Sequence, residues 1–194
     1  MSICSKKITG DIESSCTNPL YTGVMETAYI MALEDIESYT INGNIVSSIT
    51  MVSGGDPVVT QKAYHCQVLA KTPFDGTSTE MVENAVMNGF TKTVHMVIPN
   101  DGYGFRANVI DNLANGTFVM VIEHKWNDSD AKSKFEVIGL QKGLKASALA
   151  NDPNSSDTRG GWDITLVEED VPMSGVYFYA TSVTASRAAL EALC

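Results

Sequence analysis

Histidine and cysteine are the residues of this sequence with the clearest capacity for catalysis. His65, His95 and His124 all fall in segments with the alternating pattern of β-strands, and Cys66 directly follows His65. A thiol nucleophile needs a base within hydrogen-bond distance, but neighbouring strand residues point to opposite faces of a sheet. His65 therefore does not activate Cys66, and a thiol enzyme would need His95 or His124 to reach it from another strand. We predict no catalytic residues and no enzymatic activity.

Carboxylates in two loops raise the question of calcium binding. The loops are Asp128-Ser129-Asp130 and Asp152-Pro153-Asn154-Ser155-Ser156, and Ser133 and Asp157 stand where an EF-hand has its glycine at position six. The same residue types are the usual components of tight turns. We therefore interpret both loops as turns, and we predict neither a metal site nor a cofactor.

Aromatic residues offer two further surfaces. Tyr177, Phe178 and Tyr179 are contiguous, but the period of a strand sends the two tyrosines to one face and Phe178 to the other. That alternation favours a core-and-interface role over a base-stacking platform. Trp126 and Trp162 would serve a carbohydrate-binding or other ligand-binding β domain only if both were exposed aromatic platforms.

Composition limits the class of protein. The chain has 194 residues, of which 44% are hydrophobic and 19% charged, and we predict a single domain over 1–194 with 1–26 as an N-terminal extension or arm. Thirteen basic against 23 acidic residues leave a net charge of −10, the wrong sign for broad contact with nucleic-acid phosphates. The sequence shows no signal-peptide pattern and no apolar run near the roughly 20 residues of a membrane span. We expect a soluble chain that is made in a cytoplasm and has no membrane partner.

The cysteines fit that compartment. Their spacing matches neither a zinc site nor a dense disulfide framework, and thiols in a reducing compartment need no partners. A bridge between Cys4 and Cys16 is the alternative if both lie in one N-terminal excursion. The four cysteines are Cys4, Cys16, Cys66 and Cys194.

The elements that position these residues are mostly strands. Two segments are ambiguous: residues 34–39 form a turn or a short helical piece, and residues 77–88 form a short helix or an ordered loop, because Thr77 and Glu80 imitate a capping box. Residues 58–71 form a long extended segment. Alternation and turn signals predict strands at 27–33, 44–53, 91–98, 118–126, 134–139, 162–167 and 176–179.

Two helices complete the pattern. Apolar residues at helical spacing predict a helix over about 105–115 that packs on a sheet, and the asparagine and glycine at 115–116 end it. Four alanines predict a C-terminal helix over 182–193. The chain is therefore expected to be mainly β, of the α+β class.

The order of these elements from about residue 91 to 180 resembles the major tail tube proteins of long-tailed bacteriophages. A strand at 93–98 is followed by a helix at 107–113 and a strand at 116–123. Further matching segments follow at 135–139, 143–144 and 160–166, and then comes a closing aromatic strand. The first 26 residues and the alanine-rich helix lie outside the resemblance.

The resemblance implies a β-sandwich or barrel-like core with one packed helix, and no catalysis. It implies a virion protein, made in the host bacterial cytoplasm, whose copies form a homo-oligomer of hexameric rings that stack into a tail tube. Other phage virion proteins would be its partners, and DNA would pass only as non-specific cargo. An acidic lumen would repel the DNA and let it slide.

Two other functions remain open at this stage. The first is a phage head decoration or neck ring protein, which would share the β-rich fold and the acidity but would close into a small oligomer rather than polymerise. The second is the carbohydrate- or ligand-binding β domain built around the two tryptophans.

The assembly hypothesis predicts the effect of one deletion. Residues 40–57 read as a hairpin with a Gly-Gly-Asp-Pro end that reaches a neighbouring subunit. Removing them is expected to abolish polymerisation in electron micrographs and to leave a folded monomer. An unfolded product would show instead that the hairpin belongs to the core.

Overall fold

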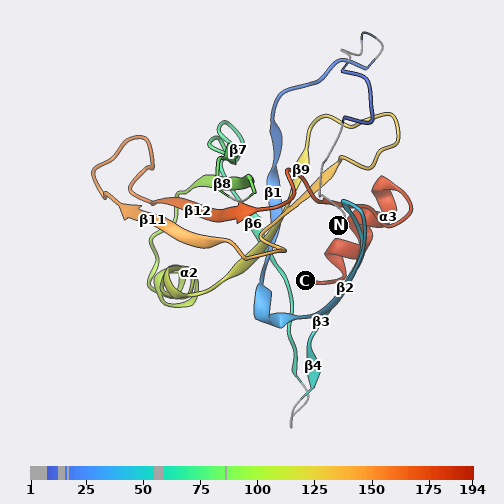
Figure 1. Ribbon diagram of the computed structural model, residues 1–194. Coiled ribbons are helices and arrows are strands. Elements are labelled where there is room, and N and C mark those ends of the chain that lie inside the picture. The colour runs from blue at the N-terminus through green and yellow to red at the C-terminus, as the bar shows by residue number, and fades with distance from the viewer. Residues whose placement is uncertain (1–7, 13–15, 17, 55–58, 86) are drawn as a thin grey trace.

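The computed structural model describes residues 8–12, 16, 18–54, 59–85 and 87–194, and it is mainly β (Figure 1). The strands are β1 (Val24–Ala32), β2 (Ile36–Asn42), β3 (Ile45–Met51), β4 (Ser53–Gly54), β5 (Val59–Thr60), β6 (Tyr64–Gln67), β7 (Ser78–Val82), β8 (Gly89–Ile98), β9 (Phe118–His124), β10 (Phe135–Ile138), β11 (Lys145–Asn151), β12 (Trp162–Val171) and β13 (Tyr177–Phe178). The helical elements are the 3-10 turn η1 (Leu33–Asp35), α1 (Tyr103–Phe105), the π-helical turn η2 (Arg106–Ile110), α2 (Asp111–Asn115) and α3 (Val183–Glu191).

The strands form two main sheets and one small ribbon. The large sheet has the order β2-β3-β13-β10-β9-β1-β6, and its strands pair antiparallel except for β13 and β3. The smaller sheet has the order β11-β12-β8-β7 and is antiparallel throughout. A third pair, β4 and β5, forms a separate two-stranded ribbon.

The first core lies between the two main sheets. Alternate residues of β8 and β12 face the large sheet, and Ile110 and Leu113 close the layer from the helical segment. Each such apolar side chain contributes about 1.5–3 kcal/mol when it leaves water. The residues buried here include Ala28, Val94, Met96, Met120, Ile122, Ile138, Ile164 and Leu166.

The second core lies on the opposite face of the large sheet. Leu190 of α3 packs there, and the Ser182 hydroxyl caps this helix by accepting a hydrogen bond from the Ala185 N–H at 3.1 Å. Residues 119–122 of β9 are thus buried on both faces of their sheet, which explains their unbroken apolar sequence. The second core includes Tyr29, Met31, Val46, Ile49, Met51, Val119, Val121, Phe135, Val137 and Phe178.

The predicted mainly-β fold, the helical segment near 105–115 and the C-terminal helix are confirmed. Both interpretations of residues 77–88 are wrong, because 78–82 form the edge strand β7. The Thr77 hydroxyl donates to the Phe74 carbonyl at 2.9 Å instead of capping a helix. Pairing with β8 satisfies the backbone of β7, and this long-range gain outweighs the local helical pattern.

Two boundaries and one strand also differ from the expectation. Residues 34–39, predicted as a turn or a short helical piece, are divided between the 3-10 turn η1, which ends at Asp35, and β2, which begins at Ile36. The N-terminal extension ends before Val24, where β1 begins. β11 was not predicted, because its mostly small and polar residues carry no strong apolar alternation. None of the helices among the described residues is long and apolar enough to cross a bilayer.

The hairpin of β2 and β3 belongs to the core, which overturns the expected result of deleting residues 40–57. Gly43, at φ +61°, is the first residue of its two-residue turn, where a positive φ is required. Val46, Ile49 and Met51 are at most 8% exposed, so the deletion removes core side chains and is expected to unfold the protein. The part that stands away from the body is the β4–β5 ribbon, whose end at 55–57 lies outside the described residues (Figure 1).

A buried carboxylate holds the turn that follows β10. Glu168 of β12 is 2% exposed and accepts backbone N–H bonds from Gly139 at 2.9 Å, Gln141 at 3.1 Å and Lys142 at 2.9 Å. Lys92, its buried cross-strand neighbour, lies opposite. Burial lowers the pKa of Lys92, while the charges of Glu136 and Glu168 oppose that effect.

Replacing this carboxylate is expected to destabilise the fold strongly. Glu168→Ala leaves three backbone N–H groups without an acceptor, so we expect a loss of about 3 kcal/mol in the free energy of unfolding, measured with urea. Glu169→Ala changes the exposed neighbour and should stay within about 0.5 kcal/mol. A loss below about 1 kcal/mol for Glu168→Ala would show that the turn does not depend on the carboxylate.

Candidate functional site

The structure does not bring Cys66 together with a histidine. Its thiol, on β6, is 8% exposed and donates to Met96 Sδ at 3.6 Å. Burial raises the pKa of this thiol to about 12, so it stays protonated and unreactive. Cys16, Cys66 and Cys194 are free thiols, whereas Cys4, the other half of the alternative bridge, lies outside the described residues.

The histidines bind carboxylates instead. His124 Nε2 lies 2.9 Å from Glu136 Oε2, and His65 Nε2 lies 3.3 Å from Glu191 Oε2. Glu191 also accepts the Tyr29 hydroxyl at 2.8 Å, and burial together with this contact raises the pKa of Tyr29. These contacts join neighbouring strands to each other and β1 to α3.

His95 lies between two carboxylates. Its Nδ1 is 2.6 Å from Asp75 Oδ1, in the loop before β7, and its Nε2 is 2.7 Å from Asp163 Oδ1 on β12. An imidazole donates from both nitrogens only when it is protonated. Burial lowers the pKa of His95, but the hydrogen bonds to Asp75 and Asp163 outweigh burial and raise the pKa above its usual value.

The close approach of Gly76 shows how tightly the loop lies on the imidazole. A Cβ at position 76 would come within 2.5 Å of His95 Cβ, so this position excludes any larger residue unless the backbone moves. His95 therefore fastens the loop at 69–77 to the outer face of the smaller sheet.

The loop carboxylates that raised calcium binding act as turn acceptors. Asp128 accepts the Lys132 N–H at 2.9 Å and the Ser133 hydroxyl at 2.7 Å, and Asp152 accepts the Asn154 N–H at 2.9 Å. Across the described part of the chain, no three His, Cys, Asp or Glu side chains are arranged to hold a metal ion.

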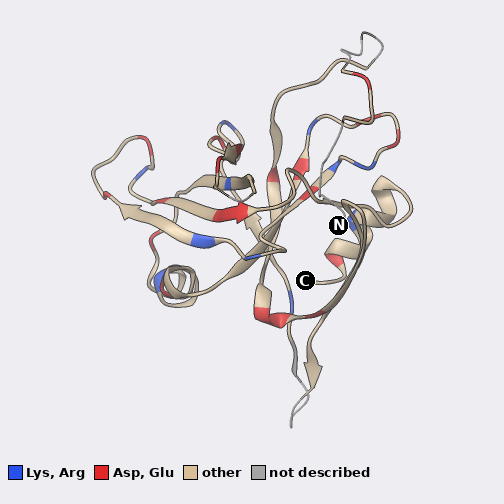
Figure 2. Ribbon diagram, in the orientation of Figure 1, with Lys and Arg blue, Asp and Glu red and all other residues tan. Residues whose placement is uncertain are grey.

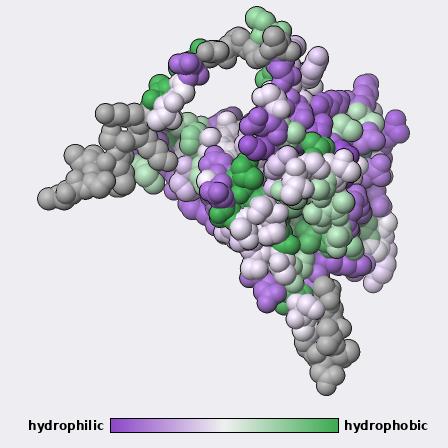
Figure 3. Space-filling model, turned by 90° about the vertical axis from the view of Figure 1, so that its right-hand side faces the viewer, coloured by the Kyte–Doolittle hydropathy of each residue, from purple (hydrophilic) through white to green (hydrophobic). Residues whose placement is uncertain are grey.

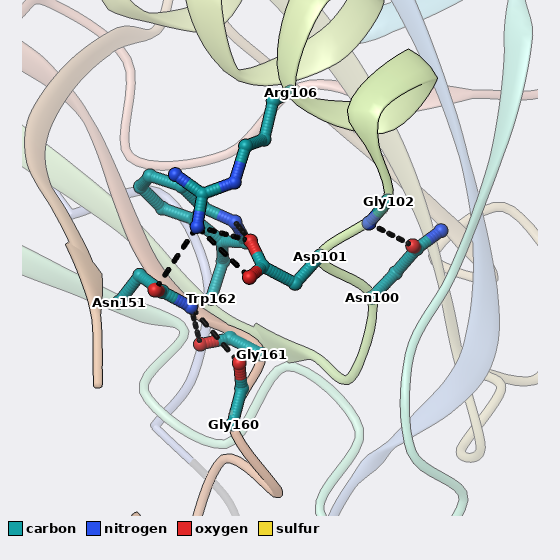
Figure 4. A network of polar contacts seen from close by, with 8 residues as sticks. All are labelled: Asn100, Asp101, Gly102, Arg106, Asn151, Gly160, Gly161 and Trp162. Atoms are coloured by element: carbon teal, nitrogen blue, oxygen red, sulfur yellow. Dashed lines mark hydrogen bonds and ion pairs between the residues drawn. The ribbon is translucent and has the colours of Figure 1, made fainter. Parts of the chain in front are cut away.

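Trp162 lies in a polar network rather than on an open surface (Figure 4). Its indole N–H donates to Asp101 Oδ1 at 3.0 Å, and the Arg106 guanidinium lies 5.1 Å from the ring centroid. Arg106 also pairs with Asp101 at 2.6 Å, and this hydrogen bond lowers the pKa of Asp101 and raises that of Arg106. One face of the ring is therefore covered by a cation.

The same network closes the loop between β11 and β12. Asn151 accepts from Arg106 at 3.3 Å and donates through Nδ2 to the carbonyls of Gly160 and Gly161, both at 2.9 Å (Figure 4). Trp126 is half-buried, and its indole nitrogen is buried without a hydrogen-bond partner among the described residues. Neither tryptophan forms the exposed platform that carbohydrate binding requires.

The aromatic run of β13 follows the predicted alternation. Phe178 is 2% exposed and lies in the second core. Tyr179 lies just past the strand, and its hydroxyl donates to the Thr181 carbonyl at 2.8 Å. These residues do not form a continuous stacking surface.

Two segments stand away from the body, and none of the contacts described above accounts for their exposed residues. The first comprises the described residues 8–12, 16 and 18–23, which include no helix or strand and stand out from the surface in Figure 3. The second is the β4–β5 ribbon, at the opposite end of the molecule in Figures 1 and 3. The exposed apolar residues of the first segment are Ile8 (79%), Ile12 (90%), Leu20 (73%) and Tyr21 (64%).

The sequence predicted an N-terminal extension. It did not single out the exposed apolar residues of that extension as an interaction surface. The signal was present, because Ile8 and Ile12 alternate with polar Thr9 and Asp11 and no preceding pattern assigns them to the core. Acidic side chains, in contrast, mark no single site: Figure 2 shows them on elements throughout the molecule.

The pKa of His95 predicts how stability depends on pH. A histidine whose pKa is raised by folding stabilises fully below its unfolded pKa of about 6.5, and the stabilisation is lost as the pH rises through the folded value. We therefore expect the difference in Tm between the wild type and His95→Gln to shrink from about pH 6 to about pH 9. Asp163→Asn, which removes one of the two charges, should weaken this pH dependence. A Tm difference that is constant across the range would contradict the doubly bonded imidazolium.

Comparison with other proteins does not supply a relative. No protein-family model matches the chain, and no curated protein or solved structure does so either. The function is therefore inferred from the residues of this chain, which hold their reactive groups in structural contacts and expose apolar side chains on a projecting segment.

Proposed function

We propose that this chain is a structural subunit that assembles head to tail with copies of itself, as the subunit of a bacteriophage tail tube. One observation carries the proposal: two extended segments project from opposite ends of a well-packed body (Figures 1 and 3). Contacts between different surfaces of successive subunits are heterologous, and they generate rings or open filaments rather than closed pairs.

The β4–β5 ribbon by itself is a reason to expect a neighbour. It pairs in a sheet of only two strands, which is marginally stable in water. Its base is closed by the hydrogen bond from the Gln61 N–H to the Val52 carbonyl at 2.9 Å. A neighbouring subunit would supply the burial that this ribbon does not obtain from its own chain.

The order of elements also supports the proposal. β8, the helical segment, β9, β10, β12 and β13 follow one another as in the pattern that resembles tail tube proteins. By that resemblance the rings are hexameric, the assembly lies in the virion, and other virion proteins meet its ends. Acidic residues lie on elements in several parts of the body, which is compatible with an acidic lumen (Figure 2).

Shortening the ribbon is expected to abolish assembly without unfolding the subunit. Residues 53–60 are replaced by Asn-Gly, which joins Val52 and Gln61 where they are already hydrogen-bonded. We expect rings or tubes for the wild type in negative-stain electron microscopy, and a monomer with Tm within about 3 °C for the variant.

A control variant and three contrary results complete this test of the ribbon. The Asn154→Ala, Ser156→Ala double variant changes exposed loop residues at another site and should assemble normally. Small closed oligomers of the wild type would favour a head decoration or neck ring protein. A wild type that stays monomeric at high concentration, or a shortened variant that still forms tubes, would contradict the proposal.

A further inference from the structure

A shallow groove runs between β3 and the last residues of the chain. Ile49, Met51 and Leu193 line it, and Cys194 lies at its end. Lys62 contributes the only charged side chain of the lining. The groove thus offers an apolar floor, and the charges of Lys62 and Glu191 both act on Cys194 at its end.

One wall of the groove is an open strand edge. β3 pairs with β2 along one side, but on its other side β13 pairs only with Ile45 and Val46. Among the described residues no further strand pairs with positions 47–51 on that side. An open edge beside apolar pockets is the arrangement that accepts an added strand from another chain.

The described residues 8–12 have the pattern of such a strand. In an extended chain Ile8, Gly10 and Ile12 share one face, and Thr9 and Asp11 share the other. The two isoleucines are 79% and 90% exposed. In the structure Gly10 forms a bend, so the segment would have to straighten on binding, and its five residues would then match the length of the five open positions of β3.

We propose that residues 8–12 of one copy bind as an added strand along the open edge of β3 in a second copy. The inference rests on the proposed head-to-tail assembly and names one of its contacts. In Figure 1 the dark blue N-terminal segment lies at the top, far from the C-terminus and β3 below, so the two surfaces face successive subunits. Asp11 brings a negative charge to the groove that Lys62 borders.

Covalent trapping tests the contact directly. Ile12→Cys is made in a Cys4→Ser, Cys16→Ser background, which leaves position 12 and Cys194 as the accessible thiols, since Cys66 is buried. A short bismaleimide is expected to link position 12 of one copy to Cys194 of the next and to give a ladder of oligomers on denaturing gels. Cys194→Ser should remove the ladder. Leu20→Cys in place of Ile12→Cys, at a site that is also exposed (73%) but lies outside residues 8–12, should give none.

Substitutions on the two faces of residues 8–12 test the contact independently, through the strength of self-association. Ile12→Asp places a charge on the apolar face and is expected to weaken self-association at least about tenfold in sedimentation. Thr9→Asp adds the same charge to the other face and should change it by less than about twofold. Both positions are exposed, so neither change perturbs the core.

The outcomes separate this contact from the proposed function. Tubes that form without cross-linking would overturn the strand contact but not the proposed tail assembly. Equal effects of Ile12→Asp and Thr9→Asp on self-association would do the same. A link within one chain would also overturn it. A ladder from a protein that forms no rings or tubes would support the contact and contradict the tail tube, and the absence of both would overturn both.

Discussion

Burial of β9 on both faces is the constraint on which the rest of the structure depends. Residues 119–122 are at most 1% exposed and contribute to both cores, so the smaller sheet must cover one side of the large sheet and α3 must cover the other. A strand that lost either cover would expose alternate Val, Met and Ile side chains to water. The fold therefore has three layers, namely the smaller sheet, the large sheet and α3. The side chains of β9 contribute to the core on each side of the large sheet.

The groups with chemical capacity serve this architecture. His95 holds a loop on the smaller sheet through two aspartates, and Glu168 gathers three backbone N–H groups of one turn. Cys66 is buried with its pKa raised, and Asp101 and Arg106 enclose Trp162. Polar groups that are paired in this way rigidify a structure, which is compatible with the proposed structural role.

Apolar residues are left in water on the body and on the N-terminal segment, and three of the four most exposed, Ile8, Ile12 and Leu20, lie on that segment. Ile8 and Ile12 are exposed on an extended segment, and the β4–β5 ribbon is too small to be stable alone. The open edge of β3 is a further unsatisfied feature, on the body itself, because no strand of the described residues pairs with it beyond Val46 on the side away from β2. Assembly between copies would satisfy all three features, and this common solution is the main reason to infer a structural role.

The sequence by itself determined the elements whose signal is local. The apolar run at 118–126 requires a buried strand, helical spacing and a following Asn-Gly identify the segment near 105–115, and alanines identify α3. Only the tertiary structure decided that 78–82 is an edge strand, that the hairpin carrying Val46 lies in the core and that Trp162 is covered by Arg106. These outcomes depend on partners far along the chain, and a short window of sequence contains neither those partners nor the hydrogen bonds and burial that they supply.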